Sequence, residues 1–301
     1  MRIVTAGSSG FLGTRLLDQL RADGHQVVQL VRRPATGPEQ VRWQPATGSL
    51  DPAVLAGADA VVNLAGAGVG DRRWTARYQQ LLRTSRVEPT ATLAETLAAA
   101  PAGSRPAVLL NASAVGWYGD TGDTEVDEQS PAGDGFFPDL CRVWEAATGP
   151  AEAAGVRVVR LRTGFPLDGT GGLLKPMLLQ FRFGLGGKLG SGRQWLPWIS
   201  MVDWLAAVRL LLTRDDLAGP VNLVAPTPVR NAEFTRALGE VMHRPTVMPI
   251  PAVALRVALG EFGTEAVTGQ RVLPGVLNRA GFQFRHGDVH SALRATLASL
   301  R

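Results

Sequence analysis

The sequence predicts an α/β protein: a doubly wound parallel sheet of the Rossmann type with a small, mostly helical C-terminal lobe. Three observations predict this class. Short β-branched runs alternate with helix-length apolar stripes, as in a parallel sheet that is covered by helices on both faces. A glycine-rich turn at 7–13 joins the first strand to the first helix. The 301 residues, 45% of them hydrophobic, are ample for a large core.

The predicted elements follow one another along the whole chain. We expect strands at 2–6, 26–31, 60–64, 107–111, 156–161 and 221–224. We expect helices at 11–22, 75–99, 136–154, 202–212, 231–242, 252–259, 264–270 and 274–279. Residues 34–57 are predicted to be rich in loop, and 116–135 to be loop. The predicted core is 1–165, completed by segments around 199–225, and the predicted substrate lobe is 166–198 with 226–301.

The composition excludes several classes of protein. The single cysteine, Cys141, excludes a disulfide framework, and no apolar run reaches the ~20 residues of a membrane span. The N-terminus does not resemble a signal peptide, so we expect a soluble, cytoplasmic protein. No metal site is expected; His286 and His290, four residues apart on a predicted helix, are interpreted as solvated side chains.

The net charge of +5 raises the question of a nucleic-acid partner. Two of the 31 basic residues are lysines, which leaves 29 arginines, and these are spread along the chain without a block of like charges. We therefore expect no nucleic-acid and no membrane partner. The expected partner is a small-molecule substrate, and both a monomer and a homodimer remain open.

The glycine turn indicates dinucleotide binding. Gly7, Gly10 and Gly13 stand in a GxxGxxG spacing between strand and helix, where glycine allows a tight turn and close approach of a ligand. The free N–H groups of the helix N-terminus favour a pyrophosphate. The predicted cofactor contacts in this turn are Gly7, Ser9, Gly10, Phe11, Leu12 and Gly13.

The end of the second strand predicts which nicotinamide cofactor is used. An acidic residue there would hold a ribose 2′-hydroxyl, but the chain has Arg32 and Arg33 instead. Two guanidinium groups suit a 2′-phosphate, so we predict NADP(H) rather than NAD(H). The alternative is a solvated pair in an arginine-rich protein.

Further motifs carry a family resemblance. Together with the glycine turn, Asn63-Leu64-Ala65-Gly66 and the run 111–119 (NASAVGWYG) resemble the extended, or epimerase-type, short-chain dehydrogenase/reductases. Finer features are similar to an atypical "epimerase family protein" branch with its own C-terminal segment of unknown function. They are the segments 73–75, 85–87, 162–164, 185–195, 198–203, 269–274 and 280–282. The resemblance implies a Rossmann core and bound NADP(H), and we expect further cofactor contacts at Leu64, Ala65, Gly66, Ala112 and Gly164.

The usual catalytic dyad of that superfamily is absent. Ser113 matches the serine that orients substrate, but Phe137 and Cys141 stand where the resemblance places a tyrosine and a lysine. Tyr118 is the remaining candidate proton donor, with packing of the loop as the alternative. Glu145 is interpreted as a surface residue or a structural ion pair, and Cys141 as a packed side chain.

Two functions follow from this pattern. The first is an oxidoreductase or epimerase-like enzyme that acts on a small polar or anionic molecule, with Ser113 at the reacting oxygen and Tyr118 or a water moving the proton. The second is an NADPH-binding sensor without turnover, which the missing dyad favours. The segment 184–198, with Arg193, Gln194, Trp195 and Trp198, is the candidate substrate-binding part of the lobe, and a structural loop is the alternative.

Overall fold

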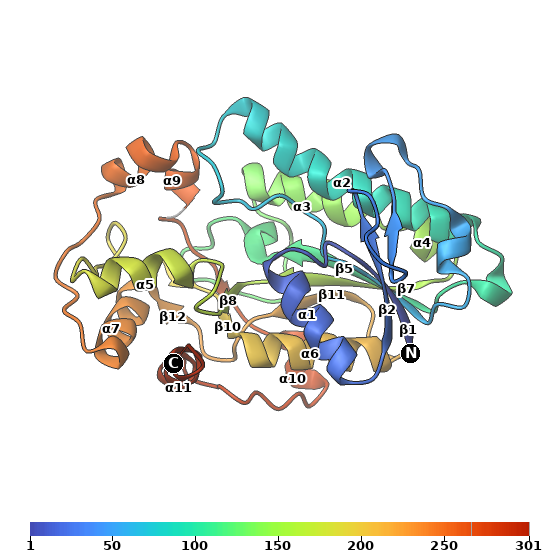
Figure 1. The fold of residues 1–301 in the computed structure, drawn as a ribbon. Helices are drawn as coiled ribbons and strands as arrows, with labels where there is room; N and C mark the ends of the chain where they lie inside the picture. The colour runs from blue at the N-terminus through green and yellow to red at the C-terminus, as the bar shows by residue number, and fades with distance from the viewer. Residues whose placement is uncertain (266, 301) are drawn as a thin grey trace.

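The computed structural model describes residues 1–265 and 267–300 and is built on a seven-stranded, fully parallel sheet (Figure 1). Its strand order is β11-β7-β5-β4-β1-β2-β3. The strands are β1 (Arg2–Ala6), β2 (Gln26–Val31), β3 (Gln40–Arg42), β4 (Ala60–Asn63), β5 (Val108–Ala114), β7 (Arg157–Thr163) and β11 (Gly219–Leu223). The order reverses between β1 and β4, and ligands of doubly wound sheets bind beside the carboxyl ends of the strands at that point. The predicted fold class is confirmed.

Helices cover both faces of this sheet, because successive strand residues point to opposite sides. Ile3 packs into a core with α1 (Phe11–Ala22) and α6 (Met201–Thr213), whereas its neighbour Val4 packs with α2 (Ala76–Ala99) and α4 (Gly149–Ala153). α3 (Phe136–Ala146) lies beside α2 and β5. The carboxyl ends of the strands therefore lie between two helical layers.

The second half of the chain builds a further hydrophobic cluster. It contains α5 (Leu174–Arg182), α7 (Asn231–Met242), α11 (Val289–Ala298), β8 (Phe165–Leu167), β9 (Trp195–Leu196), β10 (Trp198–Ser200) and β12 (Val229–Arg230). Trp198 faces this cluster while the adjacent Ile199 faces the sheet core, so the two cores share β10.

The remaining C-terminal elements pack against the N-terminal half of the chain. α8 (Ala252–Leu259) and α9 (Phe262–Glu265) lie near the start of α2, β6 (Glu125–Val126) pairs with β13 (Arg271–Val272), and α10 (Gly275–Arg279) packs on β11. Leu277 of α10 is fully buried in the sheet core. None of the described helices is long and apolar enough to cross a membrane.

Several predicted elements are corrected. The helix expected at 136–154 is two helices, because α3 ends at Ala146 and α4 starts afresh with Pro150 in its first turn. The loop-rich segment at 34–57 also contains β3 and two short 3₁₀ helices, Pro45–Thr47 and Pro52–Leu55. The segment 116–135, predicted to be loop, contains β6 and most of the 3₁₀ helix Val115–Tyr118. The helix expected at 264–270 is wrong: α9 ends at Glu265, residues 267–270 are not helical, and residue 266 lies outside the described residues.

The interpretation of His286 as solvated is also wrong. It precedes α11, so it does not share a helix with His290. The ring is buried, with Nδ1 3.1 Å from Ser200 Oγ, and its backbone N–H donates to Asp203. Asp203 also accepts from Ser200 Oγ and from the N–H of Arg285, so this cluster fixes the C-terminal segment to the start of α6.

Candidate functional site

The glycine turn packs too closely for side chains at two of its positions. Gly7 has a φ of 77°, and a Cβ there would lie 2.4 Å from the carbonyl carbon of Leu64. A Cβ on Gly13 would lie 2.1 Å from the Gly7 oxygen. The turn is therefore pressed against the loop after β4, and α1 is pressed against the turn.

The start of α1 has the properties of an anion site. Gly10 is its N-cap and offers no side chain to the first-turn N–H groups. Ser9 and Gly10 are exposed, so the N–H groups of Phe11 and Leu12 face an open approach at the positive end of the helix. A dinucleotide pyrophosphate fits this cradle.

Both arginines after β2 are exposed. The Arg33 guanidinium donates hydrogen bonds to the Pro34 carbonyl, Thr36 Oγ1 and Gln40 Oε1, so its side chain is held against its own loop. The Arg32 guanidinium has no hydrogen-bond or ion-pair partner among the described residues. Arg32 is therefore the freer cation of the pair.

The other predicted cofactor contacts lie along the carboxyl ends of the strands. Leu64, Ala65 and Gly66 follow β4, and Asn63 Oδ1 accepts a hydrogen bond from the Ala65 N–H. Ala112 lies two residues before the end of strand β5. Gly164 directly follows β7, and a Cβ there would lie 2.1 Å from the Pro197 oxygen. The fold thus brings these residues to one edge, while their contacts with a cofactor stay a prediction.

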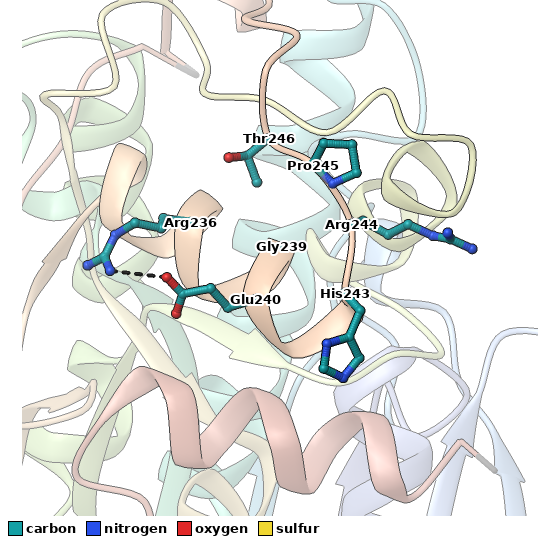
Figure 2. A pocket seen from close by; sticks show the side chains of 7 residues that line it. All are labelled: Arg236, Gly239, Glu240, His243, Arg244, Pro245 and Thr246. Carbon is teal, nitrogen blue, oxygen red and sulfur yellow. Dashed lines mark hydrogen bonds and ion pairs between the residues drawn. The ribbon is translucent and has the colours of Figure 1, made fainter.

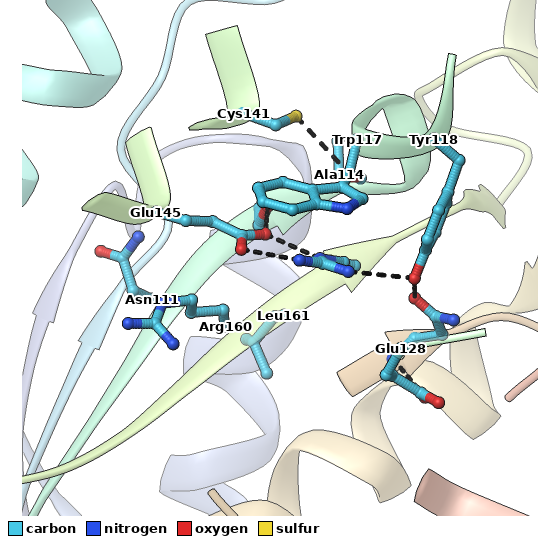
Figure 3. A network of polar contacts seen from close by, with 12 residues as sticks. Asn111, Ala114, Trp117, Tyr118, Glu128, Cys141, Glu145, Arg160 and Leu161 are labelled. Atoms are coloured by element: carbon cyan, nitrogen blue, oxygen red, sulfur yellow. Dashed lines mark hydrogen bonds and ion pairs between the residues drawn. The ribbon is translucent and has the colours of Figure 1, made fainter. Parts of the chain in front are cut away.

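Ser113 is buried and hydrogen-bonded to Glu145, which Figure 3 shows in a polar network with Tyr118. The Ser113 hydroxyl donates to Glu145 Oε1 at 2.6 Å, and Arg162 Nε and Nη2 bind the same carboxylate at 2.8 and 2.9 Å. Arg162 Nη1 donates to the Tyr118 hydroxyl, and that hydroxyl donates to Asn222 Oδ1 at 2.8 Å. Glu145 is therefore a buried ion pair, which is one of the two interpretations offered for it above.

The network continues into the C-terminal segment. Asn222 Nδ2 donates to the Leu273 carbonyl, and the Asn222 N–H donates to Glu128. Glu128 also accepts from the Val276 N–H at the start of α10. Residues from β5, α3, β7, β11 and α10 are in this way joined by one set of hydrogen bonds.

Tyr118 is enclosed by this network. Burial raises the pKa of its phenol to about 12, although Arg162 and the hydrogen bond to Asn222 act in the opposite direction. The residue is 3% exposed, and its hydroxyl is engaged on both sides by protein groups. Its role as proton donor stays a prediction; these contacts favour packing of the loop.

The two positions at which the resemblance would place the catalytic dyad, Phe137 and Cys141, are apolar in character. Cys141 is buried, with its thiol donating to the Ala114 carbonyl, and burial followed by the charge of Glu145 raises the thiol pKa to about 12. Phe137 packs edge-on against Trp74 with ring centroids 5.2 Å apart. Neither side chain supplies a proton or a fixed cation near neutral pH.

The candidate substrate segment is partly engaged by its own lobe. The Trp195 ring lies 4.5 Å from the Arg230 guanidinium and 4.8 Å from that of Arg271, and its Nε1–H donates to Asp123. Arg193 is exposed, and Gln194 donates to the Leu189 carbonyl. Trp198 is buried in the lobe cluster. Of the other three predicted contacts, Arg193 is the exposed one.

A separate shallow hollow of about 570 Å³ lies at the end of α7 (Figure 2). It is lined by Arg236, Gly239, Glu240, His243, Arg244, Pro245 and Thr246. None of the predicted site residues lines it. In the described parts of the chain, no group of three or more His, Cys, Asp and Glu side chains is placed to hold a metal ion.

Sequence reasoning did not single out Arg162, or Arg86, which is buried beside Gly66, as charges near these strand ends. Both stand in segments that were quoted only for the family resemblance, 162–164 and 85–87. The pairing of Arg162 with Glu145 joins positions 17 residues apart on different elements. No local pattern carries such information.

The sheet order and the glycine turn define the class, a dinucleotide-binding protein of the Rossmann type. Residues 3–135 match the model of the NAD-dependent epimerase/dehydratase family, and residues 250–296 match a domain of unknown function (DUF1731). The chain belongs to this epimerase family, within the short-chain dehydrogenase/reductase superfamily.

The similarity to its relatives covers nearly the whole of this chain. The chain is 48% identical to epimerase family protein Mb2239 of Mycobacterium bovis, over 97% of this chain and 96% of that protein. Among solved structures, human epimerase family protein SDR39U1 with NADPH is 34% identical, with a TM-score of 0.90 and 99% of each chain covered. A nucleoside-diphosphate sugar epimerase of Corynebacterium glutamicum is 35% identical, with a TM-score of 0.82, over 99% of this chain and 58% of that one.

Proposed function

We propose that this protein binds NADP(H) and acts as an oxidoreductase or epimerase-like enzyme on a small polar or anionic molecule. The observation that carries the proposal is the glycine cradle at the start of α1, followed by two arginines after β2. The structure of the human relative with NADPH supports the choice of cofactor.

Each part of the chain then has a task. The N–H groups of Phe11 and Leu12 bind the pyrophosphate, and Arg32 with Arg33 binds the 2′-phosphate. The bound cofactor supplies hydride-transfer chemistry. Ser113 orients the reacting oxygen; because its own proton is donated to Glu145, its oxygen offers lone pairs and accepts a hydrogen bond from a substrate hydroxyl.

The test measures cofactor affinity directly. We expect wild type to bind NADPH more tightly than NADH, and Arg32→Ala with Arg33→Ala to weaken NADPH roughly 10- to 100-fold, because charge-assisted bonds to a phosphate are lost. NADH affinity should change little. Arg214→Ala, an exposed arginine after α6, serves as the control. Equal affinities of wild type for both cofactors would contradict the assignment.

A second candidate is an NADPH-binding protein without turnover. Two features favour it. The hydroxyls of Ser113 and Tyr118 already form hydrogen bonds within the protein, and Phe137 and Cys141 stand where the family resemblance would place the dyad. Incubation of the NADP⁺ complex with a library of alcohols and sugar nucleotides, whose hydroxyls can donate to Ser113, separates the two functions. Gain of NADPH absorbance that disappears in Ser113→Ala supports the enzyme, and unchanged cofactor across the library supports the sensor.

A further inference from the structure

Arg86, on α2, is a cation buried without an acidic partner. It is 9% exposed, and its guanidinium donates to the carbonyl oxygens of Leu82 at 3.0 Å and Ala67 at 2.9 Å. No aspartate or glutamate pairs with it in the parts of the chain that are described. Burial lowers its pKa, so the fold holds this charge at an energetic cost.

The other buried arginine of the site shows the contrast. Arg162 is 3% exposed, but it binds both carboxylate oxygens of Glu145. Its charge is therefore compensated inside the protein. The charge of Arg86 is surrounded by carbonyl dipoles and the Trp144 ring, with no carboxylate counter-ion among the described residues.

Arg86 lies against Gly66, one of the predicted cofactor contacts in the loop after β4. A Cβ built on Gly66 would be 3.3 Å from both Cγ and Cζ of Arg86, so the Arg86 side chain packs closely against this exposed glycine. The neighbouring Ser85 Oγ accepts the Ala67 N–H at 3.0 Å. Ser85 and Arg86 thus hold the loop after β4 in place, and the buried positive charge lies behind the exposed backbone of Gly66.

The same guanidinium reaches toward α3. Its Cζ lies 5.1 Å from the centroid of the Trp144 ring, and its charge acts on the thiol of Cys141, which stands at the dyad lysine position. α3 itself supplies no cation there, because that thiol is neutral and buried. A cation on the adjacent helix thus acts on a position at which α3 itself has none.

We propose that Arg86 is the fixed cation of the cofactor site, delivered by α2 in place of a lysine on α3, with the anionic dinucleotide as its counter-charge. This rests on the proposed binding of NADP(H). One consequence is a preference for the reduced cofactor. The oxidised nicotinamide ring carries a positive charge and the reduced ring is neutral, so a fixed cation nearby disfavours the oxidised form.

The experiment compares the dissociation constants of NADPH and NADP⁺ by calorimetry. In Arg86→Gln and Arg86→Met we expect weaker NADPH binding and a roughly three- to tenfold fall in the ratio of the NADP⁺ constant to the NADPH constant. Arg86→Lys should keep the wild-type ratio. The double variant Arg86→Met with Cys141→Lys, which returns a cation from α3, should restore it. Arg77→Met removes an exposed charge of the same helix and is the control.

The outcomes are distinguishable. If both constants rise by the same factor in Arg86→Gln, Arg86 only supports the loop and the proposal is overturned. If wild type binds neither nucleotide, the proposed function itself fails. Thermal melting checks that the variants fold. Should the neutral variants not fold, Cys141→Lys in wild type adds a second cation; a ratio that does not rise then also overturns the proposal.

Discussion

At the scale of single residues, the enclosed Tyr118 hydroxyl makes the protein sensitive to alkali. Burial raises the folded-state pKa to about 12, against about 10 in an unfolded chain, so the folded state favours the neutral phenol. Stability from this residue is complete below pH 10 and is lost as the pH rises toward 12. Two pKa units correspond to roughly 3 kcal/mol of the free energy of unfolding.

Tyrosinate absorbance measures this prediction, since the chain has only two tyrosines, Tyr78 and Tyr118. Burial also raises the pKa of Tyr78. We expect the folded protein to show little tyrosinate at pH 10, and Tyr118→Phe to lose less stability than wild type between pH 10 and 12. Full ionisation of both phenols at pH 10 in the folded state would contradict the enclosure of Tyr118.

The residues that sequence reasoning found are those with local signatures. Gly7, Gly10 and Gly13 can be recognised by their spacing. The structure explains why two of them are glycine, because a Cβ on Gly7 or Gly13 would clash with backbone atoms. Arg86 and Arg162 have no such signature, because their importance arises from burial and from partners on other elements. Local pattern therefore predicts a backbone cradle well and a buried charge network poorly.

At the scale of elements, six of the seven strands of the parallel sheet and most of the long helices were predicted to within about three residues, because their apolar patterns are strong. The short strands outside the sheet were not predicted. The helix at 231–242 coincides with α7. Errors occur where short-range signals compete: Gly149 and Pro150 divide the stretch after α3, and the segment at 264–270 has little apolar periodicity to sustain a helix. Local sequence patterns could not predict contacts between elements far apart in the chain, such as the pairing of β13 with β6.

One tie between elements can be tested by itself. Glu145 of α3 binds Arg162 of β7 and accepts from Ser113 of β5. Glu145→Gln leaves a buried guanidinium without its anion, so we expect a loss of about 3–5 kcal/mol in the free energy of unfolding. Urea unfolding provides the measurement.

Two further variants sharpen that result. Arg236→Ala removes the partner of Glu240 in an exposed pair on α7 and should change stability by less than about 0.5 kcal/mol. Replacing Glu145 and Arg162 together by methionine should recover part of the loss, because no unpaired charge remains. A Glu145→Gln variant as stable as wild type would show that this ion pair does not hold α3 to the sheet.

At the scale of the whole molecule, the C-terminal segment is part of the core rather than an appendage. Leu277 is fully buried under the sheet, Leu273 and Val276 are hydrogen-bonded to the network of Asn222 and Glu128, and Ala292 and Leu293 complete the lobe cluster. The chain should therefore unfold in a single cooperative transition. Removal of residues 250–301 should expose both cores.

We expect a chain of residues 1–249 to lose cooperative unfolding, with fluctuating side-chain packing and exposed apolar surface. Calorimetry and binding of a hydrophobic dye measure these properties. Val253→Ser with Val257→Ser changes two exposed side chains of the removed segment and should melt like wild type. If the truncated chain melts cooperatively near the wild-type temperature, the segment is an independent unit. Its buried leucines and the Asp203–His286 cluster argue instead that the Rossmann core of this chain is completed by its own C-terminus.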